Sequence, residues 1–269
     1  MNKVSVVDRG FLYGDGVFES LRTYNGKAFL LEEHIKRLLK GAKTLKIRNL
    51  PGPRQIKLAV LNELRVIRYK ESYIKIIITR GNAKGHGLDP AKSTGKPTII
   101  VLVEKLKELP KKVYETGWSA IISTIKRPDV PSSRLKTLCY VDAILAKIEA
   151  KKVGADEAFL LDENGNLTDG TVSNIFIVKD GIISTPSIES PILAGVTRKL
   201  VIKLAKESAF PVEEKSFSTK ELFTADECFV TSSGIGIMPV TRIWKKKIGS
   251  GKPGFATEKL MQRLKQVAA

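Results

Sequence analysis

The chain has 269 residues, 42% of them hydrophobic, and carries 46 Lys and Arg against 28 Asp and Glu, a formal net charge of +18. Such a chain can bury a sizeable core, and we expect two domains. No apolar run of about 18 residues occurs, and the first residues lack the pattern of a signal peptide. The only cysteines, Cys139 and Cys228, predict neither a disulfide framework nor a metal site, so we expect a soluble cytoplasmic protein.

The basic excess is typical of proteins that bind polyanions such as nucleic acid. However, the Lys and Arg are interleaved with Asp and Glu, as in EKLKELPKK and EEKSFSTKEL, and no RRM, KH or zinc-finger motif accompanies them. Solvated helix faces explain the charge more simply. A basic nucleic-acid-binding protein therefore stays as the alternative from another class, and we expect neither nucleic acid nor a membrane as the main partner.

In the first part of the chain, Asn25-Gly26 separates two strands of GVFESLRTYNGKAFLL, because this dipeptide supplies the positive φ angles of a tight hairpin turn. Apolar spacing predicts helices over 32–46 and 54–66. Alternation in SYIKIIIT predicts a strand with Tyr73 and Lys75 on one face, and PTIIVLV predicts another. The charged, proline-bearing KLKELPKK predicts a linker over 105–112, between a small α/β lobe over 1–104 and a larger lobe over 113–269.

In the second part, GWSAIISTI predicts a strand and YVDAILAKIEAKK a helix, with an apolar stripe that should be buried, formed by Val141, Ile144, Leu145 and Ile148. Asn164-Gly165 and Asp180-Gly181 lie between apolar runs and predict two hairpins. Helices are expected from about Thr197, after the capping-box residue Ser218, and over FATEKLMQRLKQV. The mixed order, without strict βαβ alternation, indicates an α+β fold in two lobes.

The motifs that the sequence lacks argue against several classes of enzyme. Only His34 and His86 are present, without clustered ligands or HExxH, so no metal centre is expected. No GxSxG motif occurs, and GSGKPG, although it has the GxGxxG spacing, reads as a surface turn near the end of the chain. A pyridoxal phosphate site would need a lysine to form an imine, a carboxylate for the pyridine nitrogen and donors for the phosphate. Lys136 and the small-residue turn before Thr197 are candidates, although a surface cation and a capped helix would explain each one alone.

The chain resembles the fold-type IV, or class IV, pyridoxal-phosphate aminotransferases, which include branched-chain and D-amino-acid aminotransferases and aminodeoxychorismate lyases. The resemblance covers nearly the whole chain through ordered motifs: FLYGDGVFESLRTYNGKAF, EEHIKRLLKGAKTL, YIKIIITRG, RLKTLCYVDAILAKIEA, GADEAFLLDENGNLTDGTVSNIFIV, LAGVTRKLVIKLA and DECFVTSSGIGIMPV. It implies the two-lobed fold of that family, with a larger C-terminal lobe built on a mainly antiparallel sheet or barrel.

The resemblance also implies a cofactor site. Lys136 matches the imine-forming lysine, which also serves as the base that moves the substrate proton. Tyr140, four residues on and on the same side if the segment is helical, matches the tyrosine that binds the cofactor's phenolic oxygen. The residues that match phosphate ligands are Arg37, Val196, Thr197 and Ser233. Asp169 stands where the family commonly has Glu opposite the pyridine nitrogen, so its carboxylate is one methylene shorter.

On the substrate side, Tyr13, Phe18 and Arg22 match pocket positions, with Phe18 and Arg22 on one strand face. Tyr73 and Lys75 match a Tyr-x-Arg pair of branched-chain enzymes, with lysine replacing the bidentate arginine. Ser232 lies in TSSGIG, where those enzymes have Gly-Thr-Ala, and the following GIMPV is similar to the lyases. His86 is expected on a loop, because the Arg-x-His carboxylate trap of D-amino-acid enzymes is not in register.

The implied activity is transamination between an amino acid and a 2-oxo acid such as 2-oxoglutarate, by a homodimer or higher homo-oligomer with the cofactor in an interlobe cleft. Branched-chain L-amino acids are favoured as substrates. A D-amino-acid transaminase, an aminodeoxychorismate lyase and a catalytically silent relative remain alternatives. Almost nothing precedes the segment VSVVDRGF, so the small lobe either lacks the family's first strand pair or the chain as given begins late.

Overall fold

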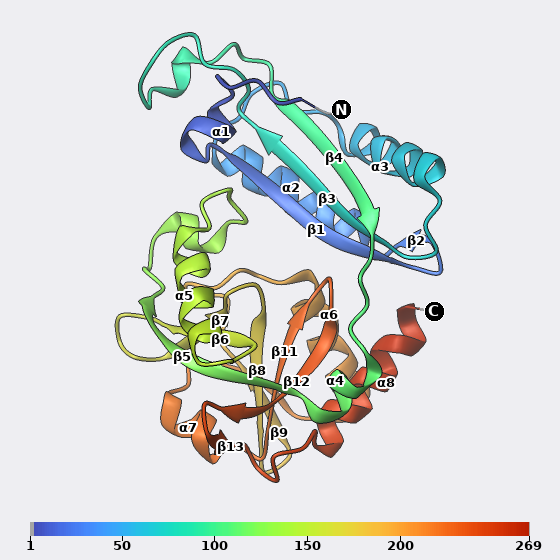
Figure 1. Cartoon of the computed structure of the whole chain (residues 1–269), viewed down its shortest axis with the longest axis vertical. Coiled ribbons are helices and arrows are strands. Elements are labelled where there is room, and N and C mark those ends of the chain that lie inside the picture. Colours follow the sequence, from blue (N-terminus) through green and yellow to red (C-terminus); the bar gives the residue numbers. More distant parts are fainter. Residues whose placement is uncertain (1–2, 269) are drawn as a thin grey trace. The chain divides into compact units, whose positions relative to one another are not determined.

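The computed structural model describes residues 3–268 and divides into two compact units (Figure 1). The first unit extends to Leu106 and also contains Leu135–Cys139, and the second contains Lys107–Arg134 and Tyr140 onward. The short stretch around Lys136 therefore belongs to the first unit. The lobe boundaries predicted from the sequence, 1–104 and 113–269, are continuous and therefore do not assign Leu135–Cys139 to the first unit.

An antiparallel sheet in the order β2-β1-β3-β4 forms the first unit. Its strands are β1 (Gly16–Tyr24), β2 (Lys27–Ala28), β3 (Ser72–Thr79) and β4 (Thr98–Lys105). Asn25 and Gly26 adopt φ angles of 51° and 74° between β1 and β2, which confirms the predicted hairpin. Before β1 lies the short helix α1 (Arg9–Tyr13), and a loop that contains η1 (Pro90–Lys92) connects β3 to β4.

Helices α2 (Leu31–Thr44) and α3 (Pro53–Ile67) pack against one face of this sheet, as their apolar periodicity predicts. The buried core between helices and sheet consists of Val17, Leu21, Leu31, Ile35, Leu38, Ala42, Ile47, Ile56, Val60, Ile74, Ile76 and Ile78. Because side chains alternate along a strand, the intervening residues point to the opposite face. Phe18, Ser20 and Arg22 lie directly opposite Ile77, Lys75 and Tyr73 on that face. We call it the open face.

The segment around Lys136 runs beside the start of β1. Thr137 forms a β-bridge with Val17, the Phe18 N–H donates to the Lys136 carbonyl at 2.9 Å, and the Leu138 N–H donates to the Gly16 carbonyl at 3.1 Å. The condition under which Lys136 and Tyr140 would share one side of a helix is therefore not met, because the backbone groups of this segment pair with a strand. The helix begins only at Val141.

A nine-stranded sheet forms the second unit. Its strands are β5 (Trp118–Lys126), β6 (Glu157–Leu161), β7 (Leu167–Gly170), β8 (Asn174–Lys179), β9 (Ile182–Thr185), β10 (Val212–Glu214), β11 (Glu227–Ser232), β12 (Gly236–Ile243) and β13 (Lys246–Lys247). Strand β8 pairs with both β11 and β7, so the order β8-β11-β12-β5-β6-β7 closes into a barrel. Antiparallel pairs predominate, and both predicted hairpins, β6–β7 and β8–β9, are confirmed.

Helices surround this barrel: α4 (Lys111–Thr116), η2 (Pro131–Arg134), α5 (Val141–Lys152), α6 (Val196–Glu207), α7 (Thr219–Thr224) and α8 (Phe255–Ala268). Ser218 and Glu221 form the predicted capping box of α7. Side chains that fill the core include Phe159, Leu167, Ile175, Ile177, Phe217, Leu222, Val230, Met238 and Val240.

Helix α5 buries a different face from the one predicted. Ala143, Ala146 and Ala150 are buried beside the residues of β5 and β6, because small side chains allow the helix to approach these strands closely. Val141, Ile144, Leu145 and Ile148 are 66%, 56%, 44% and 46% exposed in the single chain. The expected burial of this stripe is therefore wrong. The helix is apolar on two faces, so the spacing alone does not identify the buried one.

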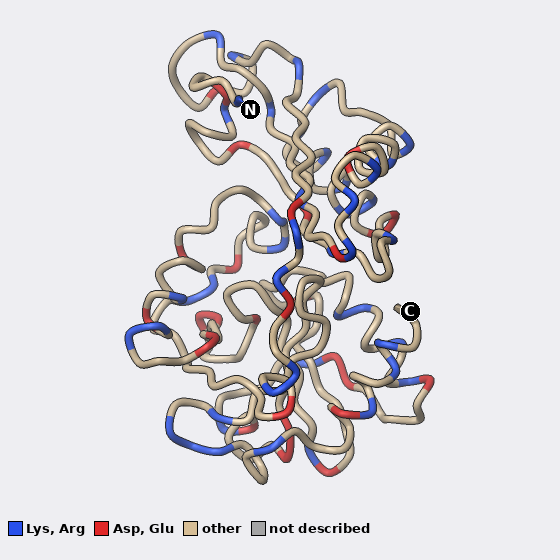
Figure 2. Tube along the Cα trace, turned by 45° about the vertical axis from the view of Figure 1, so that its right-hand side comes forward, with Lys and Arg blue, Asp and Glu red and all other residues tan. Residues whose placement is uncertain are grey.

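Charged residues are spread along both units, with Asp and Glu among the Lys and Arg (Figure 2). Within residues 3–268, we find no helix that is both long and apolar enough to cross a membrane. We likewise find, in the same part of the chain, no group of three or more His, Cys, Asp and Glu side chains arranged to hold a metal ion.

Candidate active site

On the open face of the first unit, the amines of Lys136 and Lys75 both lie over the ring of Phe18. Their Nζ atoms are 4.4 Å and 4.7 Å from the ring centroid. The Tyr73 hydroxyl donates to Ser20 Oγ at 2.8 Å on the same face. An aromatic face attracts ammonium groups electrostatically, so the Phe18 ring contacts both amines. The structure thus brings together four predicted site residues: Phe18, Tyr73, Lys75 and Lys136.

Arg22 lies further along β1 and is held by groups of its own unit. Its Nε donates to the Thr23 carbonyl at 3.0 Å, its guanidinium lies 4.2 Å from the ring centroid of Tyr24, and Nη2 is 4.0 Å from Glu71 Oε2. Arg22 is buried, and these contacts fix the direction of its side chain.

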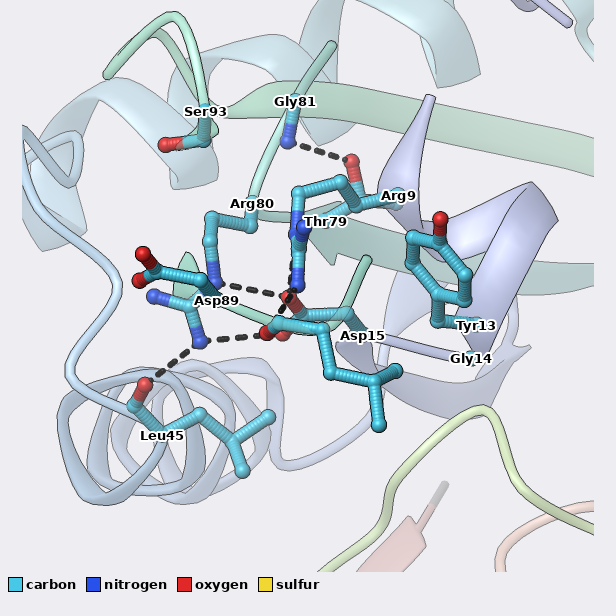
Figure 3. A network of polar contacts seen from close by, with 12 residues as sticks. Arg9, Tyr13, Gly14, Asp15, Leu45, Thr79, Arg80, Gly81, Asp89 and Ser93 are labelled. Carbon is cyan, nitrogen blue, oxygen red and sulfur yellow. Dashed lines mark hydrogen bonds and ion pairs between the residues drawn. The ribbon is translucent and has the colours of Figure 1, made fainter. Parts of the chain in front are cut away.

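Tyr13 lies beside a polar network around Asp15 (Figure 3), and contacts of Arg9 and Tyr13 fix the loop between β3 and β4. The carboxylate of Asp15 accepts from Arg9 Nε at 2.8 Å and from Arg80 Nε at 2.7 Å. Arg9 also donates to the carbonyls of Gly87 and Leu88 at 3.1 and 2.8 Å, and the Gly87 N–H donates to the Tyr13 hydroxyl at 3.2 Å. The loop that contains His86 is therefore tied to α1, and its position on a loop is as expected.

Arg37, a predicted phosphate ligand, is held by a buried carboxylate. Glu19 accepts from Arg37 Nε and Nη2 at 2.6 and 2.7 Å and lies 2.7 Å from His34 Nδ1. Burial opposes ionisation of Glu19, but the hydrogen bonds and charges of Arg37 and His34 hold its pKa below the ordinary value. Glu19 thereby fixes one edge of the Arg37 guanidinium, whose side chain is 19% exposed.

Sequence reasoning missed the roles of Glu19 and His34. The available signal was the position of Glu19 between Val17 and Leu21, on the strand face that alternation assigns to the core. A carboxylate at such a position needs a cationic partner, because an unpaired buried charge is very costly.

In the second unit, the predicted site residue Asp169 is a buried carboxylate. It is 5% exposed; its Oδ2 accepts from the Leu193 N–H at 3.4 Å and lies 3.6 Å from Arg127 Nη2. Its Oδ1 is buried and has no hydrogen-bond partner among the described residues. Burial raises the pKa of Asp169 to about 6, with Arg127 opposing this rise.

Helix α6 begins at Val196, directly after Gly195, whose position before the first turn carries no capping side chain. The Thr197 and Ser233 hydroxyls lie 3.2 Å apart, which brings together residues distant in sequence. A Cβ atom at Gly195 would lie 2.0 Å from Asn174 Oδ1, so any larger residue would force a neighbouring group to move. First-turn amides and two hydroxyls make a suitable site for an anion such as a phosphate group. Ser232 lies beside Ser233 at the end of β11, and Tyr140 directly precedes α5.

These groups fit pyridoxal phosphate. The unpaired Oδ1 of Asp169 can accept a hydrogen bond from a protonated ring nitrogen, and the start of α6 with Thr197 and Ser233 can bind a phosphate. In the first unit, the Lys136 amine and the Arg37 guanidinium have the chemistry to attach an aldehyde and to bind a phosphate oxygen.

Comparison with known proteins identifies one family. Residues 16–243 match the model described as "Amino-transferase class IV". A "Putative branched-chain-amino-acid aminotransferase" of Methanocaldococcus jannaschii is 43% identical over 268 residues, which cover 98% of this chain and 91% of that protein. A D-alanine aminotransferase of Bacillus licheniformis is 33% identical, covering 97% and 90%. An aminodeoxychorismate lyase of Bacillus subtilis is 34% identical, covering 96% and 87%.

Solved structures give the same result. The branched-chain amino acid aminotransferase of Escherichia coli superposes with a TM-score of 0.93 at 30% identity, over 99% of this chain and 90% of that one. The branched-chain aminotransferase of the archaeon Thermoproteus uzoniensis, solved with norvaline, gives a TM-score of 0.88 at 28% identity, over 99% and 89% of the two chains. A further branched-chain amino acid aminotransferase, solved with pyridoxamine 5'-phosphate, gives a TM-score of 0.93 at 31% identity, again over 99% and 89%.

Proposed function

Because the chain belongs to the class IV aminotransferase family, we propose that it transfers the amino group of a branched-chain L-amino acid to a 2-oxo acid such as 2-oxoglutarate. The family uses pyridoxal 5'-phosphate, and the chain is a pyridoxal-phosphate-dependent aminotransferase with the two-lobed fold of that family. The observation that carries the proposal is the buried, unpaired Oδ1 of Asp169, a group that a protonated ring nitrogen would satisfy.

We assign the cofactor contacts as follows. When bound, pyridoxal phosphate supplies an electron sink that withdraws electrons from the α-carbon of the substrate. Lys136 would hold the cofactor through Nζ, and the same amine would move the α-proton of the substrate as a general base. Asp169 keeps the ring nitrogen protonated, and Tyr140 donates to the phenolic oxygen. The phosphate ligands are Arg37, Val196, Thr197 and Ser233.

Substrate recognition is assigned to residues of the open face. Phe18 offers an apolar surface to a branched side chain, and Lys75 offers a cation to the second carboxylate of a dicarboxylic acceptor. Tyr73 is held by Ser20 and can orient the substrate through its ring. Tyr13, Arg22 and Ser232 complete the proposed substrate set.

The first experiment is an absorption spectrum of the protein with bound pyridoxal phosphate, before and after adding L-leucine, D-alanine or L-glutamate separately. Loss of the visible band with L-leucine and L-glutamate supports the proposed branched-chain activity. Loss with D-alanine alone would instead assign the chain to the D-amino-acid enzymes. If no amino acid changes the band but aminodeoxychorismate is consumed, the lyase alternative replaces the proposal.

Two lysine variants test the assigned amines. Lys136→Ala should abolish the visible band and turnover, whereas Lys112→Ala, a change at an exposed lysine of α4, should leave both unaltered. Lys75→Met should weaken use of 2-oxoglutarate by about tenfold or more, and Lys75→Arg should restore it, since a hydrogen bond to a charged group contributes about 1.5 kcal/mol or more and about 1.4 kcal/mol is tenfold. Equal activity of Lys75→Met with 2-oxoglutarate would refute the role of Lys75.

We also propose that the chain forms a homodimer or a higher homo-oligomer. The exposed apolar residues of α5 support this, because a second copy that covered them would remove several branched side chains from water. Replacing Ile144 and Ile148 with Glu should reduce the mass measured by light scattering to that of one chain. A parent that is already monomeric at high concentration would contradict the proposal.

A further inference from the structure

Arg127 joins three segments of the second unit. It directly follows β5, and its backbone N–H donates to the Leu161 carbonyl at 2.8 Å, which fixes the start of the side chain. Its Nη2 donates to the Ser133 carbonyl at 2.7 Å, and Nε donates to the Pro191 carbonyl at 3.2 Å. The third contact of the guanidinium is Oδ2 of Asp169, at 3.6 Å.

These contacts hold one oxygen of the Asp169 carboxyl group. Arg127 and the Leu193 N–H both contact Oδ2, and Oδ1 is buried without a hydrogen-bond partner among the described residues. Among the described residues, two charged groups face Asp169: Arg127 from the end of β5 and Glu157 from β6. The anionic Glu157 is already bound by the hydroxyls of Thr171 and Ser173. Arg127 is therefore the cation that offsets both the burial of Asp169 and the repulsion from Glu157.

Arg127 also contacts the two segments that lead to other proposed cofactor ligands. Ser133 lies three residues before Lys136 in sequence, and Pro191 lies four residues before Gly195, the residue that directly precedes α6. One planar guanidinium with several fixed donors can hold these carbonyls and a carboxylate at once, which a lysine amine cannot do with the same geometry.

We propose that Arg127 is a positioning residue that keeps Asp169 ionised and aims its Oδ1 at the cofactor's ring nitrogen. This inference rests on the proposed function, in which Asp169 is the partner of that nitrogen. Asp169 must be positioned accurately, because its side chain is one methylene shorter than the glutamate common in the family. A small displacement of its carboxylate would break the proposed hydrogen bond to the ring nitrogen.

The test compares Arg127→Met and Arg127→Lys with Arg134→Met. Arg134 is a matched control, because it also bonds a loop carbonyl, that of Glu189, and pairs with a carboxylate, but that carboxylate belongs to Asp129 instead of Asp169. Two quantities are measured for each variant: the dissociation constant for pyridoxal phosphate by fluorescence titration, and the pH at which the Asp169 carboxyl ionises in the apoprotein, by carboxyl NMR.

In Arg127→Met, the Asp169 carboxyl should ionise at a higher pH than in the parent, and cofactor affinity should fall about tenfold for each pKa unit of that change. Arg127→Lys should restore the ionisation but only part of the affinity, and Arg134→Met should leave both quantities unchanged. Parental ionisation and affinity in Arg127→Met would overturn the proposal. If Arg127→Met does not fold, the same comparison between Arg127→Lys and the parent decides.

A double variant separates positioning from general support of the fold. In an Asp169→Asn background, Arg127→Met should weaken cofactor binding much less than in the parent, because its effect passes through the missing carboxylate. An equal loss in both backgrounds would show a merely structural role and reject the inference. If Asp169→Asn alone retains the affinity, the visible band and turnover, then the proposed function of Asp169 fails instead.

Discussion

Replacing Asp169 with Asn should make the cofactor-free protein more stable at neutral pH. Asp169 ionises at about pH 6 in the folded chain, against an ordinary value of 3.8, because burial disfavours the charged form. The difference of about 2 pKa units corresponds to about 3 kcal/mol, at about 1.4 kcal/mol per unit. Since the folded pKa is raised, the favourable contribution of this group is complete below about pH 4 and is lost as the pH rises through about 6.

An asparagine does not titrate and resembles the protonated carboxyl group in size. Asp169→Asn should therefore gain up to about 3 kcal/mol relative to the parent above about pH 6, and nothing below about pH 4. Urea unfolding followed by tryptophan fluorescence measures this directly, because Trp118 and Trp244, the two tryptophans of the chain, both lie in the second unit. With a urea dependence of about 2 kcal/mol per molar, the midpoint should rise by about 1.5 M.

Asp129→Asn is the control, because Asp129 is an exposed carboxylate in the same unit and its loss should change stability by less than about 0.5 kcal/mol. The same Asp169→Asn protein should bind pyridoxal phosphate more weakly, as expected when a strained group is retained for function. If Asp169→Asn is equally stable or less stable than the parent above about pH 6, the buried carboxylate is not under strain and the reasoning is refuted.

Three further predictions concern buried contacts. Glu19→Gln should destabilise the first unit by about 3 kcal/mol in unfolding followed by circular dichroism, because it leaves the buried edge of the Arg37 guanidinium without its carboxylate partner, whereas exposed Glu32→Gln should cost less than about 0.5 kcal/mol; equal effects would contradict this. Asp15→Asn should speed proteolysis of the loop between β3 and β4, since two arginines lose their shared carboxylate, and unchanged cleavage would argue against that tether. Gly195→Ala should lower the affinity for pyridoxal phosphate more than about tenfold in a fluorescence titration, because the added Cβ displaces either Asn174 or the start of α6. Unaltered affinity would show that this turn is not part of the phosphate site.

Local residue patterns predicted many of the elements. The hairpin at Asn25-Gly26 forms because its turn requires positive φ angles that few other residues adopt, and α2 and α3 form where the apolar spacing matches a helix. Alternation placed Tyr73 and Lys75 on one face of β3 and Phe18 and Arg22 on one face of β1, and the pairing of the two strands puts these faces on the same side of the sheet. The ordered motifs identified the family, and with it the cofactor, before any contact was known.

Apolar periodicity did not predict the structure where a segment had two possible arrangements, either two apolar faces to bury or two ways to pair its backbone groups. Helix α5 is apolar on two faces, and only packing against β5 and β6 selects the alanine face. The residues from Lys136 to Tyr140 have helix-compatible side chains, yet the backbone of Lys136 and Thr137 pairs with β1. Hydrogen bonds from a distant strand decide this conformation, and no local signal reports them.

By itself, therefore, the sequence determined which residue types are available for pyridoxal phosphate chemistry and on which strands and helices most of them lie. Only the tertiary structure decided which side chains surround them: Glu19 and His34 around Arg37, and Arg127 and Glu157 around Asp169. The reason is physical. The ionisation and direction of a buried side chain depend on burial and on charges within a few ångströms, and these neighbours come from segments far apart in the chain.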